Sequence, residues 1–158
     1  QRPHLAHRIS RTAFRSSPTR KYRCDGIAVD EPISAEEWFL QPHGDVRPSN
    51  QMEVPPTEFA VQGLELDWPG VCWGADLRHD GNVWTKWQFR GSNGQTVRDE
   101  GPRVFVSNRY RVMLTKAWEG FVIFIPNGDK EDLTRAPKYY DDSYKFILSY
   151  GAKPLLMN

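Results

Sequence analysis

The sequence predicts one three-layer α/β domain built on a largely parallel sheet, with an inserted β-hairpin. Segments with strand and helix patterns alternate along the chain. The run FVIFI at residues 121–125 is wholly apolar, which is typical of a strand covered on both faces. The 158 residues suit a single domain, and a hydrophobic content of 39% is enough for a core. We assign residues 1–22 to a basic N-terminal arm and residues 23–158 to the domain.

The N-terminal arm is defined by its charge. Residues 1–23 carry seven Arg and Lys side chains and no Asp or Glu. Such a segment can bind phosphates, and Arg8, Arg11 and Arg15 are the candidate contacts. The alternative is an ordinary solvated terminus. We also expect a short helix at about residues 5–14.

The first half of the domain is expected to hold strands and one short helix. Residues 23–30 are interpreted as a strand. Ser34 stands three residues before Glu37, a capping-box pattern that predicts the start of a helix. A further strand is expected within residues 51–63, and residues 68–77 are predicted to be a buried strand that contains Cys72 as a small apolar residue.

The second half continues the alternation. Residues 83–99 are predicted to form a hairpin around a Ser-Asn-Gly turn. Ser107 is expected to cap a helix over about residues 108–117, in which Tyr110, Met113, Leu114 and Ala117 share one face.

The chain is expected to end with a strand and a helix. The strand at 121–125 should lie in the centre of the sheet, and the helix should span about residues 141–150 and stop at Gly151. Asp141 and Asp142 are interpreted as capping that helix near its positive end. Because ligands of parallel α/β sheets bind at the carboxyl ends of strands, we look for chemistry in the loops that follow strands.

Two short segments carry the functional signal. In Gln62-Gly63-Leu64-Glu65, an amide and a carboxylate share a tight loop, and Gly63 allows close approach of the backbone to a ligand. Leu114-Thr115-Lys116-Ala117 lies between a helix and an apolar strand. In their order, spacing and flanks, these segments resemble motifs V and VI of superfamily 1 helicases, and most closely the schlafen-like DNA/RNA helicase family.

The resemblance covers roughly residues 23–151. It implies a RecA-like fold, of the type that forms the second domain of these helicases. The matching positions are Gln62, Gly63, Leu64, Glu65, Asp67, Tyr110, Arg111, Val112, Leu114, Thr115, Ala117, Glu119, Gly120, Asp132, Thr134, Arg135 and Pro137.

The resemblance also implies roles for individual residues. Gln62, Gly63 and Glu65 would contact nucleotide and nucleic acid, and the arginine-finger position, which touches the γ-phosphate, is Lys116. Lys keeps the charge of Arg but lacks its planar fork. The second basic position is Trp118, which could stack on a base or simply pack. The structural alternatives are an inherited turn at Gln62–Glu65 and a solvated lysine at the helix end.

The sequence contains no G-x-x-x-x-G-K-[ST] motif, which this family carries in its first RecA-like domain. We therefore expect no ATPase activity from this chain alone, no catalytic residue and no cofactor. ATP and Mg²⁺ would bind only if a partner supplied the missing half. No metal site is expected either, because the spacing of His4, His7 and Cys24 matches no zinc pattern.

Three functional hypotheses remain open at the level of sequence. The first is an orphan or truncated helicase C-terminal-like domain that binds single-stranded DNA or RNA weakly, with contacts from Arg109, Arg111 and Lys116. The second is a protein-interaction module that self-associates or docks on a separate ATPase subunit. The third is a mobile-DNA reading frame without retained activity. Because no apolar run approaches the roughly 20 residues of a membrane span, we expect a cytoplasmic location and no membrane partner.

Overall fold

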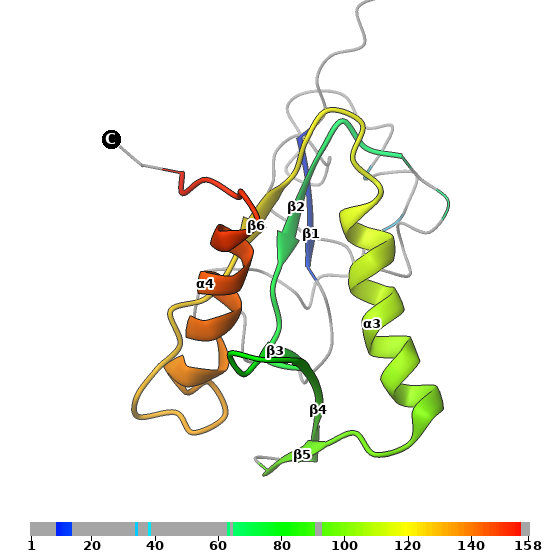
Figure 1. Ribbon diagram of the computed structural model, residues 1–158. Coiled ribbons are helices and arrows are strands. Elements are labelled where there is room, and N and C mark those ends of the chain that lie inside the picture. Colours follow the sequence, from blue (N-terminus) through cyan, green and yellow to red (C-terminus); the bar gives the residue numbers. More distant parts are fainter. Residues whose placement is uncertain are drawn as a thin grey trace, which may run out of the picture. The chain divides into compact units, whose positions relative to one another are not determined.

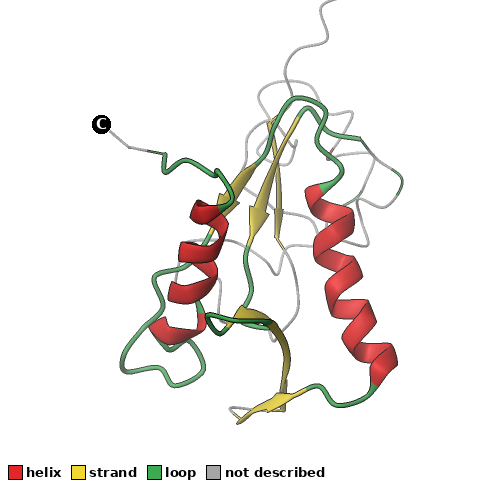
Figure 2. Cartoon of the chain, viewed as in Figure 1, coloured by secondary structure: helices red, strands yellow, loops and turns green. Residues whose placement is uncertain are grey.

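The computed structural model describes residues 9–13, 34, 38, 63, 65–90 and 93–155 (Figure 1). The helices and strands are β1 (Ile9–Ala13), β2 (Trp68–Cys72), β3 (Leu77–His79), β4 (Trp84–Arg90), β5 (Asn93–Thr96), α3 (Glu100–Leu114), β6 (Val122–Phe124), η2 (Pro137–Tyr139) and α4 (Asp141–Ser149). The chain divides into two compact units, of which the first comprises Gln1–Trp73 and Asn108–Phe124 and the second Gly74–Ser107 and Ile125–Asn158. The content is mixed α/β, as predicted (Figure 2).

The first unit holds a parallel sheet in the order β1-β2-β6 (Figure 1). Strand β2 is central, since Ile9 pairs with Trp68 on one side and Val122 pairs with Gly70 on the other. Val71 and Cys72 in β2 are buried, with exposed fractions of 0% and 5%. The buried position of Cys72 is therefore confirmed, and the strand predicted at residues 68–77 is confirmed for residues 68–72, where β2 ends.

The helix expected at residues 5–14 is wrong where the structure describes it, because Ile9–Ala13 is a strand. All five residues pair in parallel register with β2. Pairing with a buried strand satisfies the backbone groups, and this tertiary effect overrides a local helical pattern. Arg11 consequently lies on a strand of the sheet, whereas Arg8 and Arg15 lie outside the described residues.

Strand β6 corrects a second prediction. We expected it to be central and covered on both faces, but within the described sheet it pairs with β2 alone. Phe121, Val122 and Phe124 are 45%, 38% and 40% exposed. An apolar run predicts a strand, but it does not determine how many neighbours or layers cover that strand.

Helix α3 begins eight residues earlier than expected, at Glu100 rather than Asn108. The carbonyl of Asp99 accepts a hydrogen bond from the backbone N–H of Arg103 (3.2 Å). Ser107, the expected cap, lies inside the helix, and its hydroxyl donates to the Arg103 carbonyl (3.3 Å). The predicted buried face is confirmed for Tyr110 and Met113, which are 2% and 0% exposed. The helix ends at Leu114, so Ala117 lies beyond it and not on this face.

Two further contacts support the core of the first unit. The ring of Tyr110 packs against Trp73 with centroids 4.5 Å apart. The backbone N–H of Trp38 donates to the carbonyl of Ser34 (2.9 Å), and Trp38 is only 2% exposed. Trp38 is helical, which agrees with the short helix predicted from Ser34.

The second unit contains an antiparallel sheet in the order β3-β4-β5, so the part of the chain that the structure describes has two small sheets instead of one largely parallel sheet. The predicted hairpin is confirmed as β4 and β5. Its turn lies earlier than expected, because Arg90 pairs with Asn93 and both Asn93 and Gly94 belong to β5. Strand β3, which pairs with β4, was not predicted as a separate strand.

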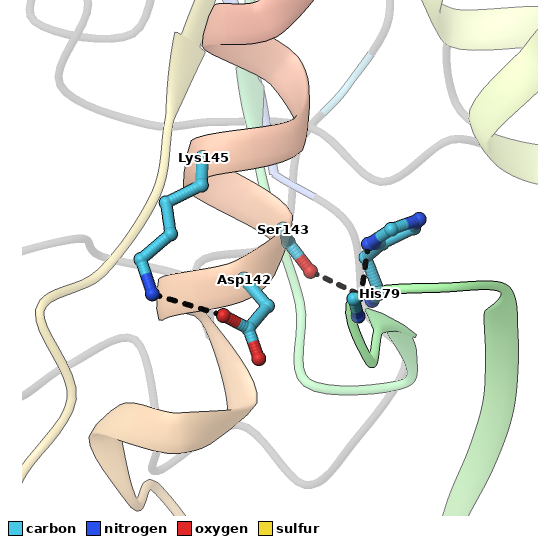
Figure 3. Close-up of polar contacts among 5 residues, drawn as sticks. His79, Asp142, Ser143 and Lys145 are labelled. Atoms are coloured by element: carbon cyan, nitrogen blue, oxygen red, sulfur yellow. Dashed lines mark hydrogen bonds and ion pairs between the residues drawn. The ribbon is translucent and has the colours of Figure 1, made fainter.

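Helix α4 confirms the predicted C-terminal helix. The expected caps are wrong, because Tyr140 occupies the N-cap position without a side-chain cap bond and Asp141 and Asp142 lie in the first turn. Gly151 has φ +97° and donates its N–H to the Leu148 carbonyl (3.0 Å), as expected for a glycine that ends a helix. Asp142 in the first turn forms an ion pair with Lys145 (3.0 Å) (Figure 3). The hydroxyl of the buried Ser143 accepts a hydrogen bond from the backbone N–H of His79 (2.9 Å). The second bond attaches α4 to β3.

Candidate nucleic-acid interface

The two segments singled out in the sequence lie side by side in the first unit. Leu66 and Ala117 form a parallel bridge. The N–H of Leu66 donates to the Lys116 carbonyl (3.0 Å), and the N–H of Trp118 donates to the Leu66 carbonyl (2.9 Å). We call residues 65–68 together with residues 116–119 the junction. The junction lies at the amino ends of β2 and β6. The strand that was expected to lead into residues 62–65 lies outside the described residues.

Two indole–carboxylate hydrogen bonds cross the junction. The indole N–H of Trp118 donates to Oε2 of Glu65 (2.8 Å), and the indole N–H of Trp68 donates to Oε2 of Glu119 (2.8 Å). A Cβ at Gly120 would lie 2.7 Å from Cη2 of Trp68, so only glycine fits there without a shift of the ring. These contacts fix the orientation of both tryptophans.

Gly63 adopts φ +80°, a conformation that favours glycine, and a Cβ placed on it would meet no atom within 4 Å. The predicted tight turn is therefore present at Gly63, with open space beside it. Gln62 lies outside the described residues.

Lys116 is half-buried beside Glu65. Burial lowers the pKa of Lys116 below its usual value, and the negative charge of Glu65 opposes that shift. Because folding lowers this pKa, the charged form of Lys116 opposes folding at neutral pH. The penalty decreases as the pH rises above the folded-state pKa, and it is gone above the unfolded-state pKa.

We expect Glu65→Gln to lower the pKa of Lys116 further, since the substitution removes the opposing charge and keeps the size of the side chain. Titration of the isotopically labelled Lys116 ammonium group by NMR would measure the shift. Glu119→Gln is the control. An equal change in both variants, or a rise in either, would contradict this role of Glu65.

The charge of the junction limits what it can bind. The junction carries three carboxylates, on Glu65, Asp67 and Glu119, and one ammonium, on Lys116. The hydroxyl of Thr115 donates to the Arg111 carbonyl (2.9 Å), so it closes the end of α3. Strong phosphate binding therefore needs basic groups from outside the junction.

The other predicted basic contacts lie partly on α3. Arg111 is exposed and Arg109 is half-buried, and both belong to the part of α3 in the first unit. The structure thus brings together Glu65, Lys116 and Trp118, and it places Arg109 and Arg111 on the preceding helix. Trp68 and Glu119 were missed as mutual partners, because 51 residues separate them and no local pattern reports such a contact.

Among the described residues, no group of three or more His, Cys, Asp or Glu side chains is arranged to hold a metal ion. His4, His7 and Cys24 lie outside them. Across the same residues, every helix is too short or too polar to cross a membrane.

Comparison with known proteins identifies the family. The family described as "Schlafen group 3, DNA/RNA helicase domain" matches residues 7–127, which include both segments of the junction. No curated protein and no solved structure matches the chain. Since the match covers most of the sequence, the chain belongs to the Schlafen group 3 DNA/RNA helicase domain family.

Proposed function

We propose that this chain is a helicase-related domain of the RecA-like C-terminal type that binds single-stranded nucleic acid weakly and does not hydrolyse ATP by itself. The observation that supports this best is the Leu66–Ala117 bridge. It joins the segments that resemble motifs V and VI, which have to meet if they are to act as one site. Membership of a DNA/RNA helicase domain family supports nucleic acid as the ligand.

The binding we propose is electrostatic and weak. Lys116, Arg109 and Arg111 provide positive charge, whereas Glu65 and its neighbouring carboxylates in the junction oppose a phosphate backbone. The affinity should therefore fall steeply as salt is added.

We also propose that residues of the same two segments bind nucleotide when a second domain is present. Gln62, Gly63, Glu65 and Lys116 would close over a nucleotide whose phosphates and Mg²⁺ are held by a separate, Walker-bearing domain. In that assembly Lys116 would supply the positive charge that an arginine finger provides, without the bidentate geometry of arginine. By itself the chain has no sequence motif that cradles phosphates.

The test is a titration of the protein into labelled single-stranded DNA and RNA at about 50 and about 200 mM salt. We expect micromolar binding that weakens with salt. Lys116→Ala should reduce the affinity several-fold, and it should reduce the slope of log affinity against log salt concentration by about one. Lys153→Ala removes an exposed lysine of the second unit and serves as the control. Absence of binding at micromolar protein would overturn the proposal.

A second candidate, self-association with another copy of the chain, is favoured by β6. Phe121, Val122 and Phe124 leave an apolar segment 38–45% exposed. A dimer in sedimentation that binds no oligonucleotide would support this candidate over the first. A monomer that binds nothing would leave the third hypothesis, a reading frame without retained activity.

A further inference from the structure

Trp118 combines high exposure with a fixed position. Its side chain is 71% exposed, although exposed aromatic rings generally gain by burial. Its backbone N–H is bound to the Leu66 carbonyl at 2.9 Å, and its indole N–H to Glu65 at 2.8 Å. An exposed ring that is held at two points loses little further freedom when a flat ligand stacks on it.

The charge beside the ring indicates what kind of ligand fits. The carboxylate of Glu65, which accepts the indole N–H, repels phosphate groups but does not repel an uncharged aromatic base. A protein partner fits less well, because charged side chains are depleted from the cores of protein interfaces. Stacking of bases on exposed aromatic rings is a general way to bind single strands.

We propose that Trp118 is a preorganised stacking platform for an unpaired nucleobase, and that Glu65 is the positioning residue that fixes the indole ring. This proposal rests on the nucleic-acid binding proposed above and adds that the base itself is contacted. The contribution of Trp118 to the binding affinity should depend on the presence of a base and not on the salt concentration. The contribution of Lys116 should depend on the salt concentration.

The experiment compares a labelled oligothymidine with an abasic oligomer of the same length and charge. We expect the unmodified protein to bind the oligothymidine about tenfold more tightly than the abasic strand. Trp118→Ala should abolish this preference and leave the affinity for the abasic strand unchanged. Tyr150→Ala, which removes another exposed aromatic side chain in the second unit, should keep the preference.

Variants of Glu65 test the positioning role. Glu65→Gln keeps a carbonyl oxygen that can accept the indole N–H, and Glu65→Ala does not. Both variants remove a negative charge and should strengthen binding to both oligomers. The informative quantity is therefore the ratio of the affinity for oligothymidine to the affinity for the abasic strand. We expect this ratio to be unchanged in Glu65→Gln and to fall in Glu65→Ala.

The possible outcomes separate this inference from the proposed function. Salt-sensitive binding with equal affinity for both oligomers would overturn the stacking platform and leave the proposed function intact. Equal loss of both affinities in Trp118→Ala would also overturn it. Binding of neither oligomer would overturn both proposals, and loss of self-association in Trp118→Ala would assign the ring to a protein contact.

Discussion

Gly128→Ala is expected to lower the free energy of unfolding by about 3 kcal/mol. Gly128 has φ +75°, and an added Cβ would lie 2.8 Å from Cα of Pro137 and 2.9 Å from its nitrogen. These are backbone atoms, so no rotation of a side chain can relieve the clash. The N–H of Asp129 also donates to the Arg135 carbonyl (2.8 Å), which holds the two arms of this loop together. Urea denaturation followed by circular dichroism would measure the change.

Alanine variants of two other glycines distinguish the effect of the steric clash from that of backbone strain. Gly151 has φ +97° but no atom within 4 Å of an added Cβ, so Gly151→Ala should cost only about 1 kcal/mol. Gly101 in α3 has neither a positive φ nor a close neighbour, so Gly101→Ala should stabilise the protein by about 0.5 kcal/mol. A cost at Gly128 no larger than that at Gly151 would contradict the proposed close packing.

Arg78→Ala is expected to destabilise the protein by about 2–3 kcal/mol. Arg78 is 6% exposed, and its guanidinium carbon lies 3.5 Å from the ring centroid of Tyr139 and 4.2 Å from that of Trp87. Its Nε donates to the Ala75 carbonyl (2.7 Å). Burial lowers the pKa of Arg78, and the neighbouring Tyr139 opposes the shift. The loss of two aromatic contacts and a charged hydrogen bond should exceed the relief from desolvation.

Arg78→Lys and Arg98→Ala are the comparisons for this prediction. Lysine keeps the charge but has no planar group that can stack on the two rings. Arg78→Lys should therefore cause at least half of the destabilisation expected for Arg78→Ala. Arg98 is exposed, so its replacement by alanine should change stability by less than about 0.5 kcal/mol. Full stability of Arg78→Lys in thermal or urea unfolding would show that the stacking contributes little.

The features that the sequence predicted correctly depend on neighbours close in the chain. The face of α3 with Tyr110 and Met113, the hairpin of β4 and β5, and the glycine stop of α4 follow from spacings of a few residues. The start of α3 was wrong because Ser107 is a good cap in principle, but the helical hydrogen bonds already begin at Asp99.

The features that the sequence could not supply depend on distant partners. The pairing of Ile9 with Trp68 defines β1, and the neighbours of β6 determine how exposed Val122 is. The same holds for the junction, since 53 residues separate Glu65 from Trp118. The resemblance to helicase motifs indicated which segments matter, but not that the two tryptophans are fixed by carboxylates from the opposite segment.

The path of the chain between the two compact units limits how the protein can be divided. The backbone passes from one unit to the other at residues 73–74, 107–108 and 124–125, so neither unit is a continuous piece of sequence. The family match ends at residue 127, before η2 and α4. A polypeptide cut at that point would lose Tyr139 and Ser143, which contact Arg78 and His79 of β3. The segment recognised by similarity is therefore smaller than the segment that must fold together.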